Sequence, residues 1–157
     1  MKTLLSILFL FFATYGYSQS EKLFTVDREL SNSNINQIYQ AKDGVIWIAT
    51  DDGLNRYDGA KFSIYKHKEG NDSSLVDNNV RTLFEDSKGH FLVGTQRGLQ
   101  LYNPATDLFK EIPIFYQTGE NMSAHISTIL ERKNGDLLRN FRTWCLFIKI
   151  RRNGTCH

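Results

Sequence analysis

The feature that most constrains this chain is a stretch of sequence that occurs twice, 45 residues apart. Residues 44–57 read GVIWIATDDGLNRY, and residues 89–102 read GHFLVGTQRGLQLY. A repeat of this length is close to one β-propeller blade, which takes about 40–50 residues. The positions that we expect to be structural in the repeat are Gly44, Trp47, Thr50, Gly53, Leu54, Tyr57, Gly89, Gly94, Thr95, Gly98, Leu99 and Tyr102.

Within each copy, short apolar segments alternate with turn residues. Residues 35–39 alternate between apolar and polar types, which predicts a half-buried strand. Residues 45–49 are almost wholly apolar, as in a strand covered on both faces, and the Asp43-Gly44 pair before them favours a tight hairpin. The expected strands are 35–39, 45–49, 54–57 and 62–65 in the first copy, and 80–85, 91–95, 99–102 and 109–112 in the second. Four short strands joined by tight turns make one blade.

The repeats cover most of the chain. We expect copies at about residues 30–65 and 75–112, and a third at 125–138, where Ile126, Ile129, Gly135 and Leu138 match the second copy at an offset of 46. The predicted fold class is therefore all-β. It is an incomplete β-propeller at residues 19–138, with two four-stranded blades and part of a third.

The first 18 residues have the parts of a secretory signal peptide. Lys2 supplies the positive start, residues 4–13 form a short apolar core, and Gly16 and Ser18 are small residues before a cut at Gln19. The core is shorter than the roughly 20 residues of a membrane span, although an uncleaved anchor is the alternative. We expect a periplasmic or otherwise exported chain with no membrane span after cleavage.

Residues 139–157 differ abruptly from the rest. They carry five basic residues and no acid, whereas the other 138 residues have 14 basic and 17 acidic side chains. The mildly acidic body argues against a general nucleic-acid binder. We interpret the tail as unrelated to the repeat and translated out of frame; an unusual natural end is the alternative. Its Cys145 and Cys156 do not match usual zinc spacing.

The tandem pattern resembles the two-component regulator propeller repeat. It is carried first by Leu30, Ser31, Asn32, Ile35, Ile38, Asp43, Gly44, Trp47, Thr50, Gly53, Leu54 and Tyr57, and again by Lys88, Gly89, Gly94, Thr95, Gly98, Leu99 and Tyr102. The resemblance implies the exported sensor region of a Bacteroidetes-type hybrid two-component histidine kinase, in which many members detect breakdown products of complex glycans. It also implies a homodimeric parent with an oligosaccharide ligand. Kinase activity does not carry over to these residues, because neither a phosphoacceptor histidine context nor ATP-binding glycine boxes are present.

Three functions follow from this sequence. The first is a fragment of a ligand-sensing, glycan-sensing propeller that does not signal on its own. The second is an exported propeller that binds or scaffolds without signalling, and the third is a fragment of a polysaccharide-degrading enzyme. The third requires paired acids or an acid and a base in a shared cleft, and no such pair is identifiable. We therefore expect no enzyme activity, no catalytic residue, no cofactor and no metal site.

The candidate ligand surface is either the axial face of the propeller or the space between paired propellers. The loops there include residues 51–53 and 96–98. The sequence does not assign individual ligand contacts. The acids of the 51–53 loop are expected to form turns, because an EF-hand needs alternating ligands and a distant glutamate. His67, His90 and His125 are expected at exposed loops or strand ends. We expect inter-blade packing, in preference to stacking on sugars, from Trp47, Tyr57, Phe62, Tyr65, Phe91 and Tyr102.

Overall fold

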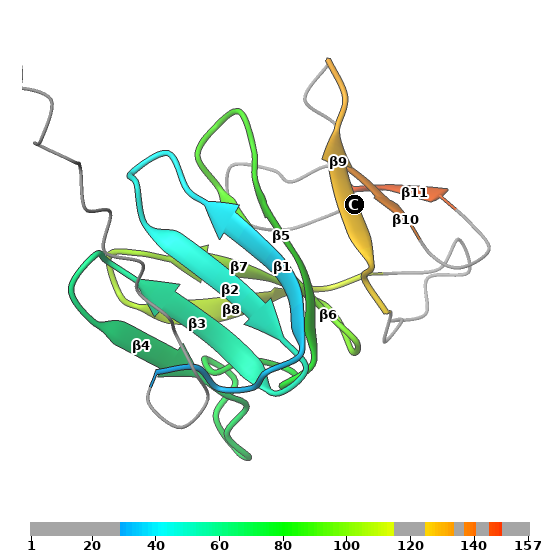
Figure 1. Ribbon diagram of the computed structural model, residues 1–157. Helices are drawn as coiled ribbons and strands as arrows, with labels where there is room; N and C mark the ends of the chain where they lie inside the picture. The colour runs from blue at the N-terminus through cyan, green and yellow to red at the C-terminus, as the bar shows by residue number, and fades with distance from the viewer. Residues whose placement is uncertain (1–28, 115–124, 134–136, 141–144, 149–157) are drawn as a thin grey trace, which may run out of the picture.

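The computed structural model describes residues 29–114, 125–133, 137–140 and 145–148. These residues form three separate antiparallel sheets and no helix (Figure 1). The signal peptide expected at residues 1–18 lies outside the described residues. No helix of the described part is long and apolar enough to cross a membrane. The all-β fold with two four-stranded blades is confirmed.

Each of the first two sheets has four strands in simple sequential order. Sheet one has the order β1-β2-β3-β4 and sheet two the order β5-β6-β7-β8. Their bounds lie within one residue of the expected strands, because turn residues at the hairpins limit where each strand can extend. The strands are β1 (Ile35–Gln40), β2 (Ile46–Thr50), β3 (Gly53–Tyr57), β4 (Phe62–Tyr65), β5 (Val80–Glu85), β6 (Phe91–Thr95), β7 (Leu99–Asn103) and β8 (Leu108–Ile112).

The third sheet extends beyond the expected end of the repeat at residue 138. It contains β9 (Thr128–Glu131), β10 (Leu137–Asn140) and β11 (Cys145–Ile148), in the order β11-β10-β9. Leu137 pairs with Ile148 in continuous antiparallel register. Ladder hydrogen bonds use only backbone groups, so an apolar segment of the tail can add a strand without matching the repeat. The out-of-frame origin of the tail stays a prediction.

The inner strands of the three sheets lie beside one another. Strand β1 contacts β5, and β5 contacts β9, which places the first strand of each blade along a common axis. One glutamate per junction ties successive blades at the far end of these strands. Glu85 Oε2 accepts a hydrogen bond from Lys42 N at 2.9 Å, and Glu131 Oε2 accepts one from Ser87 N at 2.8 Å. The two contacts occupy matching positions in the repeat, so the junctions are built alike.

Trp47 is at the centre of the apolar core between the first two blades. Its ring lies 4.7 Å from that of Phe91 and 4.9 Å from that of Tyr102, centroid to centroid. Tyr65 stacks on it from the outer strand of its own blade at 5.9 Å. A second apolar cluster joins blade two to the third sheet and includes Leu92, Leu99, Ile126 and Ile129. Each blade is thus held chiefly by its neighbour.

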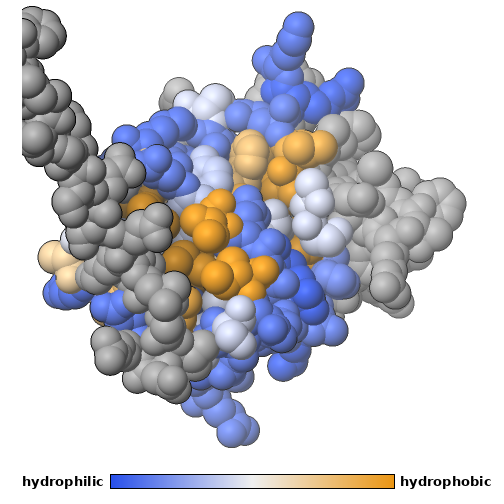
Figure 2. Space-filling view, viewed as in Figure 1, coloured by the Kyte–Doolittle hydropathy of each residue, from blue (hydrophilic) through white to orange (hydrophobic). Residues whose placement is uncertain are grey.

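Strand β1 alternates in exposure, as expected of a half-buried strand at residues 35–39, but the apolar Ile38 lies on its more exposed face, the outer face of blade one. Ile38, Ile48, Asn55 and Ile64 are successive cross-strand partners and therefore share this face. Ile38 is 62% exposed and Ile64 49% exposed, whereas Leu83, the counterpart of Ile38 in blade two, is 1% exposed. The difference arises because no described blade packs on this face. Figure 2 shows the apolar patch on the side of the first sheet that faces the viewer.

Gly94 marks the tightest contact between blade two and the third sheet. A Cβ atom here would lie 2.5 Å from Thr82 Cγ2 and 2.7 Å from Ile126 Cγ2. We expect Gly94→Ala to lower the free energy of unfolding by about 1–3 kcal/mol, because the neighbours must move to admit the methyl group. Urea unfolding followed by circular dichroism measures the change.

Gly98→Ala is the matched control for this prediction. Its nearest neighbours would be 3.6 Å from the new Cβ, and its φ lies outside the left-handed region, so we expect a change within about 0.5 kcal/mol. Thr82→Ser removes the closest methyl group and should recover part of the loss in the double variant. Equal stability of the Gly94→Ala and Gly98→Ala variants would contradict the close packing.

Candidate functional site

The candidate site is a group of polar side chains at one axial end of the first two blades. We define the axial cluster as Asn34, Asn36, Asp51, Asn79 and Arg81. Its members come from the segments entering β1 and β5, from those strands themselves, and from the turn between β2 and β3. This turn is one of the two loops expected at the axial face.

The Asp51 carboxylate is the centre of the axial cluster. Its oxygens accept hydrogen bonds from Asn36 Nδ2 at 3.0 Å, Asn34 Nδ2 at 3.2 Å and Asn79 Nδ2 at 3.4 Å. Arg81 Nη1 lies 3.5 Å from Asp51 Oδ1 and completes an ion pair. The hydrogen bond from Asn36, then that from Asn34, and the charge of Arg81 hold the pKa of this carboxyl below its usual range. Asp51 therefore stays ionised at neutral pH.

A second ion pair lies in the same turn. Lys66 Nζ is 2.7 Å from Asp52 Oδ2, and Asn78 Nδ2 donates to Asp52 Oδ1 at 3.1 Å. Gly53 N donates to Asn78 O at 2.7 Å, which fixes the turn of blade one to the segment that enters blade two. Both acids of the turn are thus balanced by a neighbouring cation.

The second loop expected at the axial face contributes differently. Gln96 and Arg97 are exposed, and Gln96 N donates to Asn79 O at 3.0 Å. This backbone contact brings the 96–98 loop beside the axial cluster. Sequence reasoning did not identify Asn36, Asn79 or Arg81. The one available signal was the asparagine that precedes each inner strand, Asn34 and Asn79, at an offset of 45 residues.

The aromatic residues follow the packing interpretation only in part. Trp47, Tyr65, Phe91 and Tyr102 belong to the core between the blades. Tyr57 and Phe62 instead stack on each other at 4.7 Å, on the outer face of blade one. Strand alternation directs these two side chains to the face opposite Trp47, on which no described blade packs, so packing between blades stays a prediction for this pair.

The three histidines occupy unrelated surroundings. His67 is exposed and its Nδ1 lies 2.7 Å from Leu75 O. His90 Nδ1 lies 2.7 Å from Asp86 Oδ2 within one hairpin. His125 precedes β9 and is partly buried. Among the described residues, no group of three or more metal-ligating side chains comes together.

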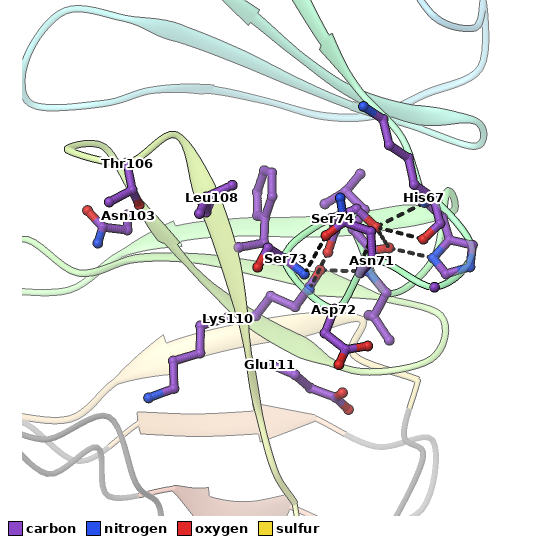
Figure 3. Close-up of a pocket in the computed structure, with 16 residues that line it drawn as sticks. His67, Asn71, Asp72, Ser73, Ser74, Asn103, Thr106, Leu108, Lys110 and Glu111 are labelled. Atoms are coloured by element: carbon purple, nitrogen blue, oxygen red, sulfur yellow. Dashed lines mark hydrogen bonds between the residues drawn. The ribbon is translucent and has the colours of Figure 1, made fainter.

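A separate groove runs along the outer edge of blade two, distant in the fold from the inner strands. Its volume is about 600 Å³, and it lies between the 67–76 connection and strand β8. Figure 3 shows its wall, where Asn71, Ser73 and Ser74 bond within the connection while Lys110 and Glu111 project from β8. Phe109 N donates to Ser73 O at 3.0 Å across this edge. The polar groups of the connection are largely used in holding its own shape.

The comparison with known families decides the identity of the repeat. The sequence pattern described as "Two component regulator propeller" matches residues 29–52 and 74–97. These two stretches match two-component regulator propeller repeats. A curated relative, histidine kinase P4 of Formosa agariphila, is 38% identical over 73 residues. That alignment covers 44% of this chain and 5% of the relative.

Solved structures with a similar fold are extracellular domains described as parts of one-component or hybrid two-component systems. The extracellular domain of BT3049 from B. thetaiotaomicron, described as a hybrid two-component system, has a TM-score of 0.65 at 25% identity. The extracellular domain of BT4673 from B. thetaiotaomicron, described as a one-component system for one structure and as a hybrid two-component system for another, has a TM-score of 0.67 at 26% identity in the first. The matches cover 75% and 90% of this chain but only 17% and 18% of those domains.

The repeated threonine of the regulator propeller repeats closes the turn beside the axial cluster. Thr50 Oγ1 donates to Gly53 O at 2.8 Å, and Thr95 Oγ1 donates to Gly98 O at 3.0 Å. Both threonines are fully buried, as are Leu54 and Leu99 just after the turns. The two glycines differ, since Gly53 has φ 130° and a Cβ there would lie 2.9 Å from Tyr65 O.

Asp107 joins two regulator propeller repeats through paired tyrosines. Its Oδ1 accepts hydrogen bonds from Tyr65 OH at 2.6 Å and from Tyr102 OH at 2.7 Å. Burial, followed by the contact with Asp107, raises the pKa of both hydroxyls above the usual value. A raised pKa in the folded state stabilises the fold below the unfolded pKa of about 10, and this contribution is lost as the pH rises further.

We therefore expect the melting temperature to fall as the pH rises above about 10, and Asp107→Asn to weaken this dependence. Asparagine tolerates the φ of 58° at this position, so the turn is kept while the charge is removed. Thermal unfolding at successive pH values from about 8 to 11.5 measures the effect, with the exposed Asp72→Asn as control. Identical profiles for the two variants would contradict a role for Asp107 in setting these tyrosine pKa values.

Proposed function

We propose that this chain forms part of the ligand-sensing propeller of a hybrid two-component sensor histidine kinase, and that its ligand is a glycan. The observation that carries the proposal is the axial cluster, an arrangement of amides and a paired carboxylate presented at the end of two regulator propeller repeats. Amides, carboxylates and guanidinium groups are the side chains that can donate to and accept from sugar hydroxyls. The similarity to extracellular sensor domains supports the same interpretation.

On this proposal the chain is exported and has neither kinase nor other enzyme activity. Export is supported by the leader-like residues 1–18 and by the extracellular origin of the similar solved domains. The aligned part of the chain spans only 5% of the histidine kinase it matches, and we propose that signalling takes place in parts of such proteins outside this region. A homodimeric parent with an oligosaccharide ligand completes the proposal; no nucleic acid or cofactor takes part.

A glycan array tests this function. The purified, fluorescently labelled chain is applied to immobilised plant, algal and host oligosaccharides, with heat-unfolded chain as the control for non-specific adsorption. Binding of the folded chain to a structurally related group of glycans is the expected result. A chain that unfolds cooperatively in urea yet binds no glycan above the unfolded control would overturn the proposal.

A further inference from the structure

The unused hydrogen-bonding capacity of the described chain is concentrated at the axial end. Three buried side-chain atoms lack a hydrogen-bond partner, namely Asn79 Oδ1, Arg81 Nε and His125 Nε2. Asn79 and His125 occupy matching places in successive repeats, because each directly precedes a fully buried residue, Val80 or Ile126. Buried polar groups in folded proteins are nearly always paired, so three at one end of the inner strands call for a physical explanation.

The orientation of the Asn79 amide follows from its neighbour. The amide nitrogen lies toward the Asp51 carboxylate, which can only accept, so the amide oxygen is the unpaired acceptor. Arg81, two residues along, leaves an unpaired donor at Nε. A donor in β5 and an acceptor just before this strand are therefore both unsatisfied beside the same carboxylate.

The contacts that hold Asn79 and Arg81 on Asp51 are long. They measure 3.4 Å from Asn79 Nδ2 and 3.5 Å from Arg81 Nη1, near the limit for useful hydrogen bonds. Arg81 Nη1 also donates to Asn36 Oδ1 at 3.3 Å, which is another long contact. On rotating, the two side chains would exchange these long contacts for bonds to atoms that now have none. The Asp51 side chain and the Arg81 side chain are each 33% exposed, so the cluster is open to a ligand.

The charges around the axial cluster favour a neutral ligand over an anionic one. Asp51 is paired with Arg81, and Asp52 with Lys66, which leaves no uncompensated cation among these four groups. An anionic ligand would satisfy Arg81 but leave the Asn79 acceptor unpaired and meet the Asp51 charge. A hydroxyl group both donates and accepts, so it can satisfy the two orphaned atoms together.

We propose that the axial cluster binds a neutral saccharide, with hydroxyl groups bridging Asn79 Oδ1 and Arg81 Nε after both side chains rotate away from Asp51. This inference rests on the proposed glycan-sensing function and makes the ligand class and the contact residues specific. His125, at the matching position of the third repeat, extends the site toward the next blade.

Calorimetric titration of the purified chain tests the proposal. The probes are neutral hexasaccharides of glucose, mannose, xylose and galactose, and acidic oligosaccharides of galacturonate, mannuronate and chondroitin sulfate. The variants are Asn79→Ala and Arg81→Ala. The control is Asn103→Ala, which removes an exposed amide at the end of β7 that lies away from the axial cluster. Urea unfolding establishes that each variant is folded. Independently of any variant, the Arg Nε–H resonance of Arg81 is followed by NMR as saccharide is added.

We expect a neutral saccharide to bind and the Arg81 Nε–H resonance to shift as it is added. The affinity for this saccharide should fall at least about tenfold in the Asn79→Ala and Arg81→Ala variants but stay unchanged in Asn103→Ala. Preferential binding of an acidic saccharide would overturn the neutral ligand class while leaving glycan sensing intact. Neutral binding that is unchanged in both cluster variants, with no shift of the Arg81 resonance, would overturn the site. Failure of the folded chain to bind any saccharide would overturn the proposed function itself.

Discussion

Replacing Trp47 with alanine is expected to lower the free energy of unfolding by about 3–5 kcal/mol, the largest loss for any single substitution considered for this chain. Trp47 is only 3% exposed and contacts aromatic rings from three strands of the two blades. Its removal leaves a cavity between sheets that are held together mainly at this surface. The substitution also removes the cation–π contact from Arg56, whose guanidinium carbon is 5.9 Å from the indole ring. Urea unfolding followed by circular dichroism measures the loss.

Two further variants separate packing between blades from hydrophobicity alone. Leucine occupies the matching position of the second repeat, Leu92, so Trp47→Leu should lose less stability than Trp47→Ala. Ile38→Ala removes a large apolar side chain from the same sheet, but this residue is 62% exposed, so we expect a change within about 0.5 kcal/mol. A Trp47→Ala variant no less stable than Ile38→Ala would contradict the packing of blade one on blade two.

The strands were predictable from the sequence because local signals agree. The Asp43-Gly44 hairpin, the apolar β2 segment and the Thr50 turn each restrict the backbone, and the second repeat provides the same signals again. Gly44 and Gly89 have φ values of 87° and 83°, as tight hairpins require. Because the second repeat carries the same signals as the first, each predicted strand is supported by two stretches of sequence.

The positions of the strands were easier to predict than which face of each strand is buried. Ile38 and Leu83 occupy the same place in the repeat, yet one is exposed and the other buried. Burial in a stacked array depends on whether a neighbouring blade lies against that face, and nothing in the sequence of one repeat encodes this. Tyr57 and Phe62 lie on this same face of blade one, whereas their counterparts Tyr102 and Phe109 are buried between the blades.

The axial end was predicted as a location but not as a set of residues. Asp51 was recognised as a turn former, while its partners Asn79 and Arg81 come from the next repeat. Such a cluster forms only when two blades are placed side by side, so spacing within one repeat cannot indicate it. The offset between Asn34 and Asn79 identifies matching positions without identifying what they contact.

A second pair of matching residues has a structural role that could not be predicted from the sequence. Asn55 and Gln100 are 45 residues apart, and both are buried in the third strand of a blade. Asn55 Oδ1 accepts a hydrogen bond from Ser31 N at 2.8 Å, and Gln100 Oε1 accepts one from Val76 N at 2.9 Å. Each amide thereby fixes the chain segment that enters its own blade.

Gln100→Met is expected to lower the free energy of unfolding by about 2–4 kcal/mol. Methionine has a similar length, so the substitution removes hydrogen bonds while leaving little cavity. Val76 N loses its acceptor, and Ser74 O loses the bond of 2.9 Å from Gln100 Nε2, which leaves two backbone groups without partners. Each unpaired buried group costs about 1–3 kcal/mol, whereas a well-packed hydrophobic exchange costs less than about 1.5 kcal/mol. Urea unfolding and hydrogen exchange at the Val76 amide measure the two consequences.

Gln96→Met is the matched control, because Gln96 is exposed and the same atoms are exchanged outside the core. We expect it to change stability by less than about 0.5 kcal/mol and to leave exchange at Val76 unaffected. Similar losses in both variants would mean that the cost arises from the methionine and not from the broken bonds. A loss confined to Gln100, with faster exchange at Val76, would establish that a buried amide fixes the entry of the chain into the blade. Asn55→Leu should then reproduce the effect at Ser31, since the same device recurs one repeat earlier.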